Sequence, residues 1–110
     1  MNQLNISERQ ENGYEILEFS GPVNSYTFTE FQERIVKAVK KSNVIVDMAK
    51  VSTLSSAGLG VLMAAMEDAQ AAGRKLWILK PSEIVQLAID STGFTENFRI
   101  IRSMKDVDQL

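Results

Sequence analysis

An apolar segment between two short apolar runs constrains the fold of this chain most. The segment, Val51 to Met66 (VSTLSSAGLGVLMAAM), begins with hydroxyl side chains and two glycines and continues as an apolar run long enough to form a helix. The flanking runs, Val44 to Met48 and Lys75 to Lys80, read as short strands buried on both faces. Strand, helix and strand in this order predict a βαβ unit with two parallel strands.

The central helix is predicted to pack on the sheet through larger apolar side chains. They recur at the i, i+3, i+4, i+7 spacing of one helix face: Leu59, Leu62, Met63 and Met66. Ser55 and Ser56 stand at its N-terminus, where backbone N–H groups are unpaired and the helix dipole is positive. A serine there can cap the helix, and a phosphate there would be stabilised.

The N-terminal part is predicted to form a β-hairpin. Leu4 to Ser7 and Tyr14 to Phe19 have strand character, and Asn12-Gly13 between them is typical of a type I′ turn. Gly21-Pro22 is expected to end the second strand, because proline has no N–H for the ladder.

A helix is predicted from Thr27 to Lys41 or Ser42. Its apolar residues share one stripe: Phe28, Phe31, Ile35 and Val39. Thr27 and Glu30 have the spacing of a capping box at its start.

The C-terminal part continues the alternation of strands and helices. Ser82 is expected to cap a third helix that closes at Ser91 to Gly93. Phe98 to Ile101 is predicted as a last strand and Met104 to Leu110 as a final turn, with Val107 and Leu110 facing inward. The chain is therefore expected to be one α/β domain, residues 1–110, with a mixed sheet of four to five strands and helices packed on it.

Composition excludes several classes of function. The 110 residues contain no cysteine and no histidine, which removes thiolate chemistry, imidazole catalysis and the usual transition-metal ligands. The net charge is −2 without a basic stripe, so no nucleic-acid partner is expected. The N-terminus lacks a signal-peptide pattern and no window has the length of a membrane span, so a cytoplasmic location without membrane contact is expected. No metal and no cofactor are predicted.

The serine and glycine segment permits several interpretations. It lacks the Lys-Ser/Thr of a phosphate-binding loop and the G-x-S-x-G of a hydrolase. Asp47 alone is thin evidence for acid–base catalysis, and it is expected to accept hydrogen bonds from backbone amides of the following loop. Gly58 and Gly60 are explained if the helix packs closely on the sheet, and Ser56 is explained as a modification site.

The residues from Val44 to Leu79 (VIVDMAKVSTLSSAGLGVLMAAMEDAQAAGRKLWIL) resemble the signature of STAS domains, specifically the small anti-sigma factor antagonists of bacteria. That family has a strand ending in Asp or Asn, a spacer, and then Asp-Ser-Ser/Thr/Ala-Gly-Leu-Gly before a helix. Gly21 with Asn24 and Ser25 falls where the family has an early G-x-x-D-type loop, and Pro81 to Phe94 resembles its later segment.

The resemblance implies a protein without enzymatic activity that binds an anti-sigma factor and so frees a sigma factor. The anti-sigma factor in this family is often a serine kinase with a histidine-kinase-like ATPase fold, and a PP2C-type phosphatase removes the phosphate. The implied phosphate acceptor is Ser56, and Asp47 matches the acid at the strand's end. The partner-binding residues it implies are Asn24, Ser25, Thr53, Ser55, Ser56, Gly58 and Leu59.

Two departures from the pattern bear on this expectation. Ser55 replaces the motif's Asp, and Asn24 stands where an Asp is common. Both remove negative charge near the acceptor, and Ser55 becomes a second candidate acceptor. The alternative is a STAS module that is not phosphorylated, binds another signalling protein or a small ligand, and uses Ser56 only as a helix cap.

Overall fold

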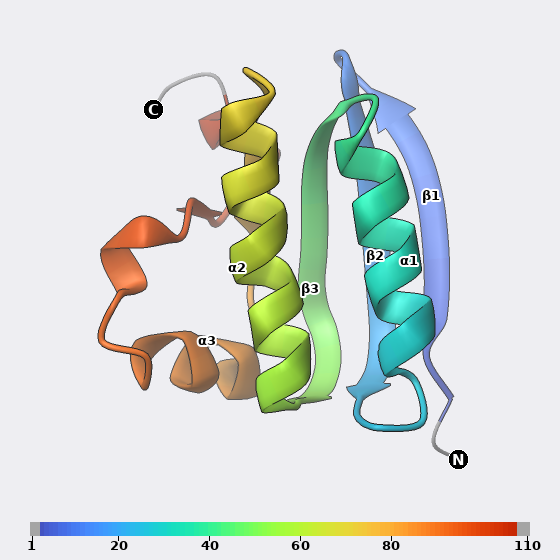
Figure 1. Cartoon of the computed structure of the whole chain (residues 1–110), viewed down its shortest axis with the longest axis vertical. Coiled ribbons are helices and arrows are strands. Elements are labelled where there is room, and N and C mark those ends of the chain that lie inside the picture. The colour runs from blue at the N-terminus through green and yellow to red at the C-terminus, as the bar shows by residue number, and fades with distance from the viewer. Residues whose placement is uncertain (1–2, 108–110) are drawn as a thin grey trace.

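The fold is one five-stranded mixed sheet with helices packed against it, in a computed structural model that describes residues 3–107. The strands lie in the order β1-β2-β3-β4-β5 (Figure 1), with β1 antiparallel to β2 and every other neighbouring pair parallel. The predicted α/β class and mixed sheet are therefore confirmed. The elements are β1 (Asn5–Glu11), β2 (Tyr14–Val23), α1 (Phe28–Val39), β3 (Asn43–Leu54), α2 (Ser56–Ala71), β4 (Leu76–Leu79), α3 (Glu83–Asp90), η1 (Thr95–Asn97), β5 (Ile100–Ile101) and η2 (Met104–Asp106).

The predicted N-terminal hairpin is confirmed. β1 pairs with β2 over its whole length, from Asn5 opposite Ser20 to Glu11 opposite Tyr14. Asn12 and Gly13 both have positive φ, 54° and 83°, as a type I′ turn requires. The short strand expected at Leu4 to Ser7 is therefore real and extends four residues further, to Glu11.

Two strands are longer than predicted. β2 does not end at Gly21-Pro22 but runs to Val23, and β3 does not end at Met48 but runs to Leu54. The β2–β3 register shifts between Glu18 and Ser20 and again between Gly21 and Pro22. The second shift coincides with the proline, and a bulge is where a strand tolerates a residue without an N–H.

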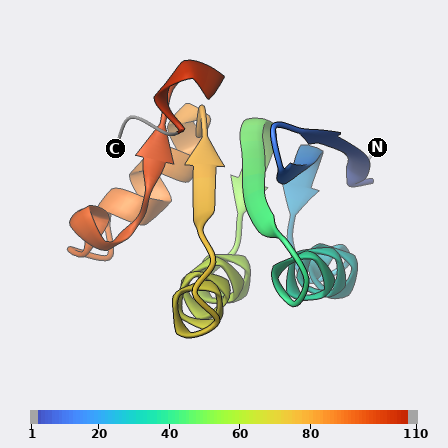
Figure 2. The ribbon, with the colours of Figure 1, turned by 90° about the horizontal axis from the view of Figure 1, so that it is seen from above.

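Helices α1 and α2 lie side by side on one face of the sheet (Figure 2). They form the larger core cluster with the sheet, for example through Phe31 of α1 and Leu62 of α2, and Val85 and Ile89 of α3 join it. A smaller cluster on the opposite face contains Ile16, Ile45, Trp77, Leu79 and Ile101. The C-terminal segment covers that face with Met104 and Val107.

Helix α1 forms without the predicted capping box. Thr27 is its N-cap, but its side chain accepts no hydrogen bond from the first turn, because the hydroxyl is engaged with the preceding chain. The helix also ends at Val39, with Lys40 as C-cap, rather than at Lys41 or Ser42. Its predicted stripe is confirmed, since Phe31, Ile35 and Val39 are buried.

Helix α2 is rotated relative to the predicted face. Of the four residues expected to face the sheet, Leu62 is fully buried and Leu59 and Met66 are partly buried against the core, but Met63 is 38% exposed. The residues that the helix buries are Gly58, Val61, Leu62, Ala65 and Ala69. Small side chains therefore face the sheet, which lets the helix approach it closely.

The C-terminal part agrees with the predictions in outline. Ser82 caps α3 by accepting the amide N–H of Val85 at 3.3 Å. The last strand is confined to Ile100–Ile101, and the final turn is a 3-10 helix at Met104–Asp106. Val107 is buried as expected, whereas Leu110 lies outside the described residues.

Candidate functional site

The ends of β2 and β3 bring two distant segments of the chain together. These strands run parallel to their last pair, Val23 opposite Leu54, so the segments that follow them leave the same edge of the sheet. The amide of Ser55 donates to the carbonyl of Val23 at 2.9 Å. The turn from Val23 to Thr27 therefore lies beside the start of α2, at one end of the molecule (Figure 1).

The turn between β2 and α1 is held by hydrogen bonds from two side chains. Asn24 Oδ1 accepts the amides of Tyr26 at 2.9 Å and Thr27 at 3.1 Å. Thr27 Oγ1 accepts the amide of Asn24 at 3.0 Å and donates to the carbonyl of Pro22 at 2.8 Å. The predicted residue Asn24 thus builds the turn, while Ser25 beside it is exposed.

Ser55 and Ser56 have different positions at the start of α2. Ser55 is the N-cap, with extended φ and ψ of −70° and 162°, and its Oγ accepts the amide of Gly58 at 3.1 Å. Ser56 is the first helical residue and is exposed, and within residues 3–107 its side chain makes no hydrogen bond. Ser55 therefore performs the capping role that the sequence left open between the two serines.

Replacing Ser55 with alanine is expected to lower the free energy of unfolding by about 1 kcal/mol, because the amide of Gly58 loses its acceptor. The matched variant Ser56→Ala is expected to change it by less than about 0.5 kcal/mol, since no bond is lost. Urea denaturation of both proteins measures the difference. Equal losses in the two variants would contradict the assignment of the cap.

Close packing explains one of the two helix glycines. A Cβ at Gly58 would lie 2.7 Å from Val23 Cγ1 and 2.9 Å from Leu54 Cδ1, so only glycine fits between the ends of β2 and β3. A Cβ at Gly60 would meet nothing within 4 Å. The expectation of close packing is confirmed for Gly58 and wrong for Gly60, whose exposed position has no packing reason in the described chain.

The remaining predicted residues differ in how close they lie to the start of α2. Thr53 is exposed at the end of β3, and Leu59 is partly buried on the first turn of α2. Asp47 lies further away, within β3 and not at its end, and it is only 8% exposed. Its Oδ1 accepts the amide of Ala49 at 3.1 Å, beside the first register shift. Asp47 therefore bonds a backbone amide as expected, but it supports a bulge in the strand and not the serine turn.

Sequence reasoning missed the most exposed large side chain of this end of the molecule. Tyr26 is 90% exposed and stands in the turn between Asn24 and Thr27. A hollow of about 410 Å³ adjoins it, lined also by Gln3, Leu4, Thr27 and Glu30. The available signal was a tyrosine outside every apolar stripe, in a turn next to a predicted site residue.

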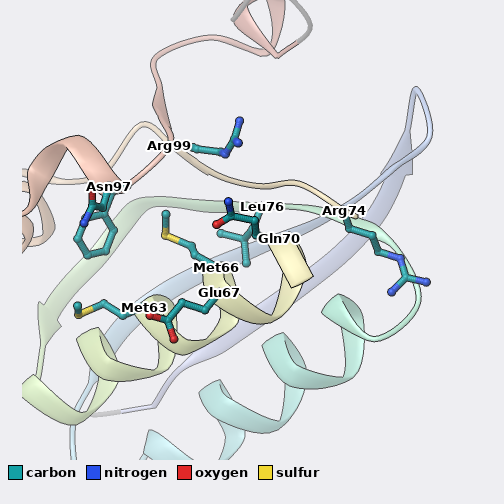
Figure 3. A pocket seen from close by; sticks show the side chains of 9 residues that line it. Met63, Met66, Glu67, Gln70, Arg74, Leu76, Asn97 and Arg99 are labelled. Carbon is teal, nitrogen blue, oxygen red and sulfur yellow. The ribbon is translucent and has the colours of Figure 1, made fainter. Parts of the chain in front are cut away.

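A second cavity, of about 370 Å³, lies between α2 and the segment before β5. Its lining is mixed: it is apolar at Met63, Met66, Leu76 and Phe98, and polar at Glu67, Gln70, Arg74, Asn97 and Arg99. Its two arginines point away (Figure 3), since Arg74 donates to the carbonyls of Val39 and Lys40 and Arg99 stacks over Trp77. None of the predicted site residues lines it.

Residues 3–107 form neither a metal cluster nor a membrane-spanning helix. In that range no three His, Cys, Asp or Glu side chains gather where they could hold a metal ion. Nor does any helix there have both the length and the apolar character needed to cross a bilayer.

Comparisons with known proteins agree with this fold. Among similar solved structures is an anti-sigma factor antagonist from Mycobacterium paratuberculosis, with 20% identity and a TM-score of 0.84, covering 94% of this chain and 90% of that one. Another is the anti-sigma factor antagonist SpoIIAA in its unphosphorylated form, with 15% identity and a TM-score of 0.76, covering 96% and 95%. The phosphorylated form of SpoIIAA from Bacillus matches with 14% identity and a TM-score of 0.71, covering 96% and 98%. At these identities the likeness shows a shared fold.

The sequence itself matches the family profile of the STAS domain over residues 5–107, which confirms the resemblance noted in the signature segment. The match takes in both sides of the site, the turn after β2 and the start of α2. The chain therefore belongs to the STAS domain family.

Proposed function

We propose that this STAS domain is an anti-sigma factor antagonist that binds a kinase-type anti-sigma factor and is released when Ser56 is phosphorylated. The observation that carries the proposal is the difference between the hydrogen bonding of the two serines. Ser55 is committed to the helix cap, whereas Ser56 is exposed and its hydroxyl is unbonded within the described chain. A phosphate on Ser56 would disturb no hydrogen bond of the described chain, whereas a phosphate on Ser55 would change the oxygen that accepts the amide of Gly58.

The electrostatics of the site favour a switch that acts on binding. No residue from Val51 to Met66 is ionisable, so a phosphate on Ser56 would introduce the only charge of that segment, about −1.5 to −2. The positive end of the α2 dipole stabilises a phosphate at the first helical position, so the fold is kept. A partner that packs against the neutral surface would have to desolvate the new charge, and its binding is weakened.

The known relatives of this fold support the same role. Both unphosphorylated and phosphorylated structures of the anti-sigma factor antagonist SpoIIAA share the fold of this chain. In the proposed cycle, Ser56 Oγ takes the γ-phosphoryl group of ATP in the kinase's active site, and ADP and a proton leave. A PP2C-type phosphatase hydrolyses the phosphoserine. The STAS domain performs no catalysis itself and acts in the cytoplasm.

Mass spectrometry of a phosphorylation reaction tests the proposal. The purified chain is incubated with ATP and each kinase-type anti-sigma factor of the organism that encodes it, and the intact mass is measured. The parent and Ser55→Ala are expected to gain one phosphate, and Ser56→Ala none. Phosphate on Ser56→Ala would show that another hydroxyl is the acceptor, with Ser55 as the second candidate, and no phosphate on any protein would favour the STAS module that is not phosphorylated.

A further inference from the structure

We infer that Tyr26 and Glu30 form a receptor for an arginine or lysine side chain of the partner, and that Tyr26 is the anchor of the interface. The inference rests on the proposed function, because it names residues that the same binding event uses. It concerns the hollow beside Tyr26, which no sequence pattern pointed to. Four observations carry it: the exposure of Tyr26, the rigidity of its turn, the carboxylate nearby and the position of the turn.

The exposure of Tyr26 is unusual for a large aromatic side chain. The residue is 90% exposed, whereas the chain's other tyrosine, Tyr14, is 7% exposed. Tyrosine is enriched among the residues that dominate binding energy, because it buries a large area and has few rotatable bonds to immobilise. A partner that covers this ring removes a large apolar surface from water.

Hydrogen bonds fix the backbone of the turn that carries the ring. The backbone amide of Tyr26 is held by Asn24 Oδ1, and the next residue, Thr27, is bonded to Asn24 and Pro22. A turn fixed by these bonds loses little further entropy when a partner binds, which improves affinity. The bonds engage Asn24 and Thr27 and leave the ring of Tyr26 free to make contact.

The residues that line the hollow next to the ring indicate which kind of side chain the partner places there. The side chain of Glu30, in the first turn of α1, lines it and forms no ion pair within residues 3–107. Because Tyr26 and Glu30 both line this hollow, a cation seated there has an aromatic side chain and a carboxylate within its surroundings. A guanidinium suits this geometry best, since it can stack on the ring while donating to the carboxylate.

The position of the turn joins this receptor to the phosphorylation site. Val23, at the start of the turn, accepts the amide of Ser55 and packs against Gly58 of α2. The receptor and Ser56 therefore lie at one end of the molecule (Figure 1), where a single partner can cover both. In this arrangement Tyr26 contributes to the affinity for the partner, and the phosphorylation of Ser56 regulates the binding.

Binding measurements with four variants test the inference. Calorimetric titration uses the kinase-type anti-sigma factor that phosphorylates the parent chain, in the presence of ADP. Tyr26→Ala is expected to weaken binding about 30-fold, the size of a strong anchor. Tyr26→Phe, which keeps the ring, should stay within about 3-fold of the parent.

Glu30→Gln should weaken binding about 5-fold at low salt and make it less sensitive to salt. Phe94→Ala is the control, an exposed aromatic beyond α3, and should leave the affinity unchanged.

A chemical measurement reports directly on the ring. Tetranitromethane nitrates exposed tyrosines, so in the free chain Tyr26 is expected to react and the buried Tyr14 to remain unmodified. In the complex the nitration of Tyr26 should fall at least 10-fold.

The outcomes separate this inference from the proposed function. If Ser56→Asp abolishes binding while Tyr26→Ala binds normally and the ring stays reactive, the switch stands and the receptor is overturned. Equal losses in Tyr26→Ala and Phe94→Ala also overturn it, because the effect is then not specific to the site. If the parent binds no kinase-type anti-sigma factor, both proposals fail.

Discussion

Ser56→Asp is expected to weaken binding to the kinase-type anti-sigma factor roughly 100-fold, or about 2.7 kcal/mol, while leaving the fold intact. The large effect is expected because the segment from Val51 to Met66, which carries Ser56, has no ionisable side chain, so the aspartate would be its only charge. A carboxylate covered there by a partner loses its hydration and gains no counter-charge from this chain.

The stability of the same variant should change by no more than about 1 kcal/mol, because Ser55 still caps the helix and an acid is favourable in its first turn. Ser56→Asn is the control, since it has nearly the size of aspartate and no charge, and it should bind within about 3-fold of the parent. Calorimetry gives the affinities and urea denaturation the stabilities. If the Ser56→Asp protein bound the anti-sigma factor as tightly as the parent does, the proposal that a charge at this position releases the partner would be wrong.

Gly58→Ala is expected to lower the free energy of unfolding by about 1–3 kcal/mol, the usual cost of overpacking. The added methyl group would press on Val23 and Leu54, at the ends of the two strands that carry the site. It should therefore also weaken partner binding, by moving α2 relative to the turn that precedes α1.

Gly60→Ala is the matched control, two residues along the same helix. Its methyl group meets nothing within 4 Å, and alanine favours the helix by about 0.5–1 kcal/mol, so this variant should be more stable than the parent. Denaturation curves of the two variants should shift in opposite directions. If Gly60→Ala also lost stability, the prediction that its methyl group is free of contacts would be wrong.

The parts of the fold that the sequence predicted well depend on local signals. The turn at Asn12-Gly13 needs only two residues that tolerate positive φ, and Ser82 needs only the free amides of the helix that follows it. The runs at Val44 to Met48 and Lys75 to Lys80 stood out as apolar, and they contain the buried first half of β3 and the buried β4, Leu76–Leu79. Each of these signals acts within a few residues, so the rest of the chain is not needed to read it.

The errors fall where distant parts of the chain compete with local preference. β3 continues to Leu54 through polar residues because β2 supplies its hydrogen-bond partners, and the bulges that accommodate Pro22 are not visible in either strand alone. The buried face of α2 was misplaced because the helix is apolar almost all round, so its pattern of large residues does not show which side faces the sheet.

The sequence by itself determined that the chain forms an α/β sheet structure, that it contains neither cysteine nor histidine, and that two serines stand at the start of a helix. Only the tertiary structure assigned their roles. The carbonyl of Val23 holds the amide of Ser55 and places this residue outside the helix as its cap, which leaves Ser56 exposed in the first turn. The same contact places Tyr26 at this end of the molecule. A hydrogen bond between residues 32 positions apart in the sequence is set by the pairing of β2 with β3, so no local pattern could have revealed it.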